Sequence, residues 1–110
     1  MDIVEEKIQD VWVLKPLGRI DASCSGQVKD KVLSMIDGNR TRVLLDLSEV
    51  DFIDSSGLGN LVSCLNTMNK AGGAFKLCSF QENPKHVFEM TRLDRVFEVY
   101  EDRDEALGSF

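Results

Sequence analysis

The hydrophobic pattern of the chain alternates between short apolar runs and longer segments with a helical stripe. Short runs, apolar or alternating with polar residues, are typical of strands when turn residues flank them. The pattern predicts five strands, at residues 3–8, 11–14, 43–47, 74–79 and 96–100. Because the run at 43–47 is almost continuously apolar, we expect a central strand that is covered on both faces. Gln9 and Asp10 fit a hairpin turn, and Pro16 is expected to limit the second strand.

Apolar residues at helical spacing predict four helices between these strands. They cover residues 22–36, 56–69, 83–91 and about 102–107. The second has the clearest stripe, at positions 58, 61, 62, 65 and 68. Ser23 or Ser25 is a suitable N-cap for the first helix, and Asp102 or Asp104 for the last.

The order of the elements is therefore ββαβαβαβα, which predicts an α/β fold. A hairpin followed by alternating helices and strands gives a mixed, mostly parallel β-sheet of about five strands with about four helices. We find no linker, no internal repeat and no shift in composition, so we expect a single domain over residues 1–110.

Charge and composition narrow the classes of function. The chain has 19 acidic and 13 basic residues, a net charge of −6, which argues against binding to nucleic acid. No apolar run approaches the roughly 18 residues of a membrane span, and the N-terminus lacks the features of a signal peptide. We therefore expect a cytoplasmic protein. Cys24, Cys64 and Cys78 match no metal-binding spacing and are interpreted as reduced, mostly buried thiols.

The run from Asp51 to Gly59 carries the candidate chemistry. It places Ser55 and Ser56 after a buried strand and at the start of a helix, beside Asp54 and Gly57. Free N–H groups and the helix dipole at such a position suit a phosphate group. Asp and Ser are also the preferred N-caps, so the same residues fit an ordinary cap. The local pattern leaves both alternatives open.

Enzymatic alternatives lack support in the sequence. We find no nucleotide-binding loop, no nucleophile elbow and no cluster of metal ligands. The only histidine, His86, is expected on the surface, so a hydrolase using Ser55 or Ser56 would have no identified base. We therefore expect a protein that is not an enzyme and that uses no cofactor.

The run 45–59, which contains Asp54-Ser55-Ser56-Gly57-Leu58-Gly59, resembles the signature of the bacterial STAS-domain anti-sigma factor antagonists. Residues 17–21 are similar to the family's segment before the first helix. Ala71-Gly72-Gly73 is similar to its helix-to-strand glycine pair, and residues 88–97 to its closing helix and strand. The resemblance covers essentially all of the chain, in the same order of elements.

The resemblance implies a regulator of transcription that works by partner switching. In this family, an anti-sigma factor that is also a serine kinase phosphorylates the serine that matches Ser55. The unphosphorylated protein binds the anti-sigma factor, phosphorylation releases it, and a PP2C-type phosphatase restores the hydroxyl. Asp21 matches a family position at the partner-binding surface. With Asp54, Ser55, Ser56 and Gly57 it makes up the expected partner site, in which Ser56 is expected to cap the helix.

A second hypothesis keeps the fold but not the modification. In it the chain is a non-phosphorylated STAS scaffold subunit of a stress-signalling or transporter complex, and the same surface serves assembly alone. Under the first hypothesis Ser55→Asp is expected to bind its partner poorly. The two hypotheses differ in the intact mass after incubation with ATP and a candidate kinase, because a gain of about 80 Da on Ser55 is expected under the first alone.

Overall fold

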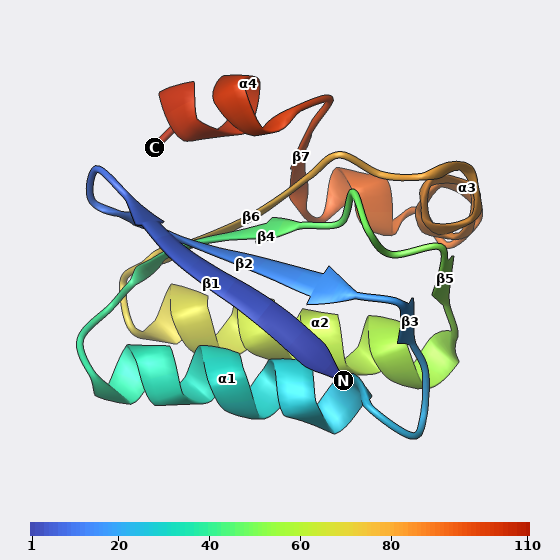
Figure 1. Ribbon diagram of the computed structural model, residues 1–110, viewed down its shortest axis with the longest axis horizontal. Coiled ribbons are helices and arrows are strands. Elements are labelled where there is room, and N and C mark those ends of the chain that lie inside the picture. The colour runs from blue at the N-terminus through green and yellow to red at the C-terminus, as the bar shows by residue number, and fades with distance from the viewer.

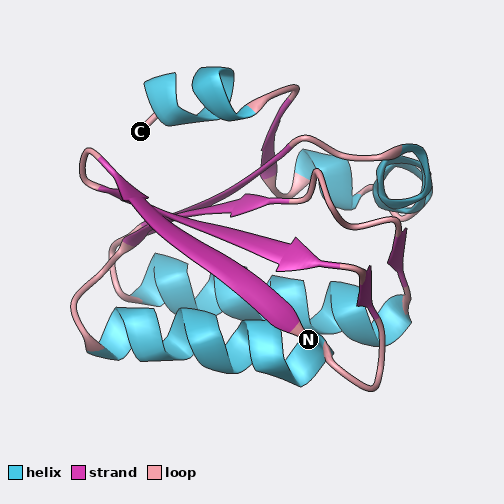
Figure 2. Cartoon of the chain, viewed as in Figure 1, coloured by secondary structure: helices cyan, strands magenta, loops and turns pink.

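The computed structural model describes residues 1–110 and contains one five-stranded sheet in the order β1-β2-β4-β6-β7 (Figures 1 and 2). The strands are β1 (Asp2–Ile8), β2 (Val11–Leu17), β4 (Arg42–Asp46), β6 (Ala74–Cys78) and β7 (Glu98–Tyr100). The helices are α1 (Ser25–Asp37), α2 (Ser55–Lys70), α3 (Glu82–Met90) and α4 (Arg103–Gly108), with a 3₁₀ turn, η1, at Leu93–Arg95. Only β1 runs antiparallel to its neighbour, so the predicted mixed, mostly parallel α/β fold is confirmed.

Helices cover both faces of the sheet, which explains why its central strands are apolar. In Figure 1, α1 and α2 run side by side and in the same direction beneath one face, while α4 lies above the other. The larger core of 19 buried residues lies on the α1–α2 side and includes Leu14, Leu45 and Leu77 from three successive strands. A smaller core of five residues, among them Leu44 and Ala106, lies under α4.

Charged side chains connect α4 to the sheet, and two of them, Asp46 and Lys76, are buried. Arg103 donates to the carboxylate of Asp46 at 2.9 Å and to that of Glu6 at 2.8 Å. Burial lowers the pKa of Arg103, but the hydrogen bonds to Asp46 and Glu6 outweigh this effect and raise it above its ordinary value. Lys76 Nζ donates to the carbonyl oxygen of Ser109 at 2.8 Å. These contacts satisfy charged groups that would otherwise be costly to bury.

Several boundaries differ from the prediction. β2 continues through Pro16 to Leu17. Its pairing with β4 ends at Leu14, so the backbone N–H that proline lacks is not required for a hydrogen bond to β4. The last strand begins at Glu98, since Val96 follows the 3₁₀ turn that the apolar pattern did not reveal. Helix α1 starts later than residue 22, at Ser25, and its N-cap Cys24 makes no capping side-chain hydrogen bond.

Two of the three thiols are buried, as expected. Burial raises the pKa of Cys64 to about 12 and that of Cys78 to about 11, so neither is a nucleophile at neutral pH. Cys24 is partly exposed, and its Sγ lies 2.9 Å from the carbonyl oxygen of Arg19. None of the helices combines the length and the apolar character that crossing a membrane requires.

Candidate functional site

A second, two-stranded sheet places the candidate residues at one end of the molecule. It consists of β3 (Arg19–Ile20) and β5 (Phe52–Ile53), which pair in parallel. The backbone N–H of Asp54 donates to the carbonyl oxygen of Ile20 at 3.3 Å, so the strands end together. Asp21 and Asp54, which are 33 positions apart in sequence, therefore become neighbours. Two-residue strands are too short to give a period, and the sequence pattern did not predict them.

Asp54 joins two segments through its carboxylate. Its Oδ1 accepts a hydrogen bond from the backbone N–H of Gly57 at 2.8 Å, which caps α2. Its Oδ2 accepts one from the backbone N–H of Ala22 at 3.1 Å, in the loop that leads to α1. The prediction that Ser56 caps α2 is therefore wrong. The N-cap residue is Asp54, and Ser56 lies inside the first turn of the helix.

Ser55 and Ser56 are the first two residues of α2, and both are exposed. Neither hydroxyl takes part in a hydrogen bond within the protein. The backbone N–H groups of the first turn of a helix have no partner inside the helix. Because Asp54 uses only the N–H of Gly57, those of Ser55 and Ser56 remain available to an anion. The Ser55 hydroxyl is therefore accessible and lies where a phosphate would be stabilised.

Gly57 allows α2 to approach the small sheet closely. A Cβ atom at this position would lie 2.5 Å from the carbonyl oxygen of Ile20 and 3.1 Å from Cγ2 of Ile53. Gly57 is buried, whereas the nearby Gly59 is exposed and a Cβ there would meet nothing within 4 Å. Close packing therefore requires glycine at position 57, whereas it places no such requirement on position 59.

Asp21 supplies a fixed negative charge beside this turn. Its Oδ1 accepts hydrogen bonds from the hydroxyl of Ser23 at 2.5 Å and from the backbone N–H of Ser23 at 3.0 Å. The hydroxyl, and then the N–H, hold the pKa of Asp21 below its ordinary value of 3.8, with a smaller contribution from Arg19. Ser23 therefore does not cap α1, and Ser25, which accepts from Asn60 at 2.6 Å, does not either.

We predict that Ser23→Ala raises the pKa of Asp21 toward the ordinary aspartate value. The native pKa is depressed, so the ionised form stabilises the folded loop above the unfolded pKa, and this contribution is lost as the pH falls through the native value. A ¹³C NMR titration of the carboxyl groups measures the change. An unchanged Asp21 titration in the variant would show that the Ser23 hydroxyl is not the main cause.

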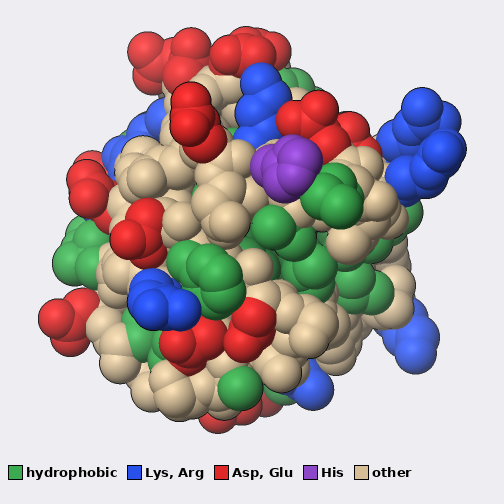
Figure 3. Space-filling model, turned by 90° about the vertical axis from the view of Figure 1, so that its right-hand side faces the viewer, with side chains coloured by type: hydrophobic (Ala, Val, Ile, Leu, Met, Phe, Trp, Pro, Cys, Tyr) green, Lys and Arg blue, Asp and Glu red, His purple; other side chains and the backbone are tan.

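Arg19 is the basic side chain next to these carboxylates. Its guanidinium lies over the ring of Phe52 at 4.4 Å and its Nε is 3.8 Å from Oδ2 of Asp21. The stacking holds the cation on the surface beside the acidic turn. Figure 3 shows this end of the molecule, where acidic and basic side chains surround an apolar area and no deep cavity opens.

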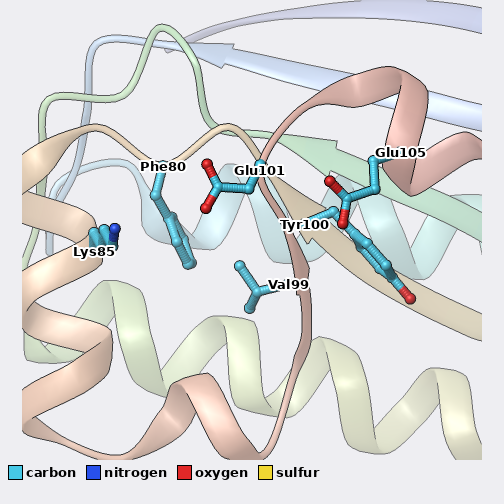
Figure 4. Close-up of a pocket in the computed structure, with 6 residues that line it drawn as sticks. All are labelled: Phe80, Lys85, Val99, Tyr100, Glu101 and Glu105. Carbon is cyan, nitrogen blue, oxygen red and sulfur yellow. The ribbon is translucent and has the colours of Figure 1, made fainter.

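The pocket of the structure lies elsewhere. It is formed between α3, β7 and the start of α4 (Figure 4). Its lining residues are Phe80, Lys85, Val99, Tyr100, Glu101 and Glu105. None of them belongs to the candidate site, which is a surface and not a cleft. A surface of this kind suits another protein better than a small substrate.

The structure does not assemble a hydrolytic or metal site around Ser55. His86 is exposed on α3 and makes no hydrogen bond to either serine. No group of three or more His, Cys, Asp or Glu side chains is arranged to hold a metal ion. Sequence reasoning missed the double role of Asp54. The preference of aspartate for the N-cap position could have indicated the cap, but nothing local indicates the bond to Ala22.

Comparison with known proteins gives consistent matches over almost the whole chain. Residues 2–106 match the family model of the STAS domain. A Thermotoga neapolitana protein, provisionally named an anti-sigma factor antagonist, is 33% identical over 91% of this chain and 89% of its own length. The anti-sigma-B factor antagonist of Listeria monocytogenes is 29% identical over 96% of this chain and 93% of its own length.

Solved structures agree with these matches. The crystal structure of a provisionally named anti-sigma factor antagonist from Thermotoga maritima gives a TM-score of 0.92 at 29% identity, covering 97% of this chain and 92% of that one. SpoIIAA of Bacillus in its phosphorylated form gives a TM-score of 0.75 at 19% identity, covering 98% of both chains. Its unphosphorylated form gives 0.73 at 18% identity, covering 98% of this chain and 96% of that one. At these low identities the SpoIIAA structures show a shared fold alone.

Proposed function

Because this chain belongs to the STAS domain family, we propose that it is an anti-sigma factor antagonist, a regulatory protein and not an enzyme. Two observations support this function: relatives that span nearly the same length bear the name, and the site is a surface suited to a protein partner. We propose further that residues 1–110 form one STAS domain and act in the cytoplasm. There the protein would bind an anti-sigma factor and so release the sigma factor that this partner inhibits.

We propose that phosphorylation of Ser55 controls this binding. The observation that carries the proposal is the exposed hydroxyl of Ser55 at the first position of α2, while Asp54 caps the helix. A kinase can reach this oxygen without breaking a hydrogen bond of the folded protein. Asp21, Asp54 and Ser56 form the rest of the proposed partner site, and Gly57, which is buried, lets α2 pack closely beneath them.

The charges of the site explain how phosphorylation could switch partner binding off without unfolding the protein. Phosphorylation adds about −1.5 to −2 charges beside Asp54 and near Asp21. The free N–H groups at the start of α2 stabilise this charge in the isolated protein. In an interface the same charge must be desolvated next to like charges, and this costs several kcal/mol, where each 1.4 kcal/mol is about tenfold in affinity. The isolated protein thus keeps its fold while the complex dissociates.

The proposal requires two enzymes as partners. The anti-sigma factor is itself the serine kinase, and a PP2C-type phosphatase removes the phosphate. The net charge of −6 argues against binding to nucleic acid, so control of transcription would pass through these proteins.

Incubation with ATP and the kinase-type anti-sigma factor of the same organism tests the modification. We expect a mass gain of about 80 Da, the mass of one phosphoryl group, with the phosphate located on Ser55 by fragmentation. Ser56→Ala is the matched control and should accept the phosphate, whereas Ser55→Ala should not. A native protein that gains no phosphate, yet binds the anti-sigma factor, would instead be a non-phosphorylated scaffold subunit.

A further inference from the structure

We infer that Asp54 is a positioning residue that couples the state of Ser55 to the loop that carries Asp21. The inference rests on the proposed function, because it names the route by which a phosphate on Ser55 would alter a second part of the partner surface. It predicts a change in the free protein that can be measured without any partner.

The coupling begins with the two oxygens of one carboxylate. Oδ1 of Asp54 holds the start of α2 through the N–H of Gly57 at 2.8 Å, and Oδ2 holds the loop through the N–H of Ala22 at 3.1 Å. The loop at residues 21–24 makes its other side-chain hydrogen bonds within residues 19–24. The bond from Ala22 is therefore the side-chain link between this loop and the segment that starts α2.

Ala22 lies between the two residues that form the charged turn of the loop. Asp21 precedes it and Ser23, which donates twice to the Asp21 carboxylate, follows it. Backbone N–H groups of Cys24 and Ser25 also hold the carbonyl oxygen of Asp21, at 3.1 and 2.8 Å. The bond from Ala22 is the restraint on this turn that comes from the Asp54 carboxylate, so the orientation of the turn depends in part on Asp54.

A phosphate on Ser55 would act directly on the Asp54 carboxylate. It would be attached to the next residue in the chain and would attract the same N–H groups at the start of α2. Its charge would also repel the carboxylate. Competition for the N–H of Gly57 and repulsion both favour movement of Asp54 away from the helix. Because the same side chain holds Ala22, the loop would lose its side-chain link to Asp54, and the backbone of Ala22, next to Asp21, would become more mobile.

Amide hydrogen exchange by NMR on the free protein tests this route. The sample carries phosphoserine at position 55, introduced during synthesis, and is compared with the unmodified chain. We expect the amide of Ala22 to exchange at least about tenfold faster, as for the loss of one hydrogen bond to a charged acceptor. The amide of Leu61, in the middle of α2, should exchange at an unchanged rate.

Two substitutions distinguish the specific loss of the Ala22–Asp54 hydrogen bond from the general effect of removing a helix N-cap. Asp54→Ala should accelerate exchange at Ala22 by at least about tenfold without a phosphate. Asp102→Ala is the matched control, because Asp102 caps α4 through the N–H of Glu105 at 2.8 Å and bonds to no distant loop. It should leave Ala22 unchanged. If Asp54→Ala does not fold, the phosphoserine protein decides, since it retains every native side chain.

An unchanged exchange rate of Ala22 in the phosphoserine protein would overturn the coupling. If that protein also failed to bind the anti-sigma factor, the proposed switch would stand and only its route through Asp54 would be refuted. Faster exchange at Ala22 with unaltered partner binding would support the coupling and contradict the switch.

Discussion

Ser55→Asp is expected to bind the anti-sigma factor at least about 30-fold more weakly than the native protein, the equivalent of about 2 kcal/mol. The substitution places a permanent charge at the first position of α2, beside Asp54 and near Asp21, where an interface would have to desolvate it. Ser55→Ala removes only an exposed hydroxyl without a hydrogen bond, so it should retain the native affinity. Isothermal titration calorimetry with the purified anti-sigma factor, in the absence of ATP, measures both.

The control must add the same charge elsewhere on α2. Asn66 is exposed and lies three turns beyond Ser55 on this helix, so Asn66→Asp changes the net charge equally. Its affinity should stay within about threefold of the native value, because exposed charges beyond the Debye length of about 8 Å are largely screened. If Ser55→Asp and Asn66→Asp bind equally well, position 55 is not part of the interface.

Gly57→Ala and Gly59→Ala should change stability in opposite directions. The added Cβ at position 57 lies 2.5 Å from a backbone oxygen of β3, and such overpacking costs about 1–3 kcal/mol. At position 59 it meets nothing, so the gain in helix propensity of about 1 kcal/mol remains. The gain in helix propensity is common to both positions, so urea unfolding should place the two variants about 1–3 kcal/mol apart, the cost of the overpacking, with Gly57→Ala the less stable.

Gly59→Ala also controls for helix propensity, because both glycines lie in the first turns of α2. Equal stabilisation of the two variants would show that α2 does not pack closely against Ile20. A changed m-value would instead indicate an altered denatured state, so the comparison requires parallel transitions.

The fold was largely predictable because most of its elements are long and carry a clear period. The stripe of α2 and the apolar run of β4 fix one helix and one central strand, and the glycines after α2 mark its end. The elements that were missed are β3, β5 and η1, each of two or three residues. Their backbone conformation depends on tertiary pairing, such as that of Ile20 with Ile53, which local patterns do not contain.

The resemblance selected the candidate residues, but the sequence did not indicate the hydrogen bonds that connect them. The resemblance implied that Asp21 and Ser55 belong to one surface, and the pairing of β3 with β5 brings the loop of Asp21 beside the start of α2. The role of cap was assigned to Ser56 instead of Asp54, because both residue types favour N-caps and the sequence does not show which carbonyl the helix starts from. The bond from Ala22 to Asp54 joins segments 32 residues apart, and no local rule predicts it.

The most direct test of the account is whether one phosphate on Ser55 reversibly abolishes partner binding. The dissociation constant for the anti-sigma factor is measured with the unmodified protein, with the protein phosphorylated on Ser55, and again after treatment with a PP2C-type phosphatase. We predict that the affinity falls at least about 100-fold on phosphorylation, a loss of about 2.7 kcal/mol, and returns fully after dephosphorylation. Equal dissociation constants for the phosphorylated and unmodified proteins would contradict the account.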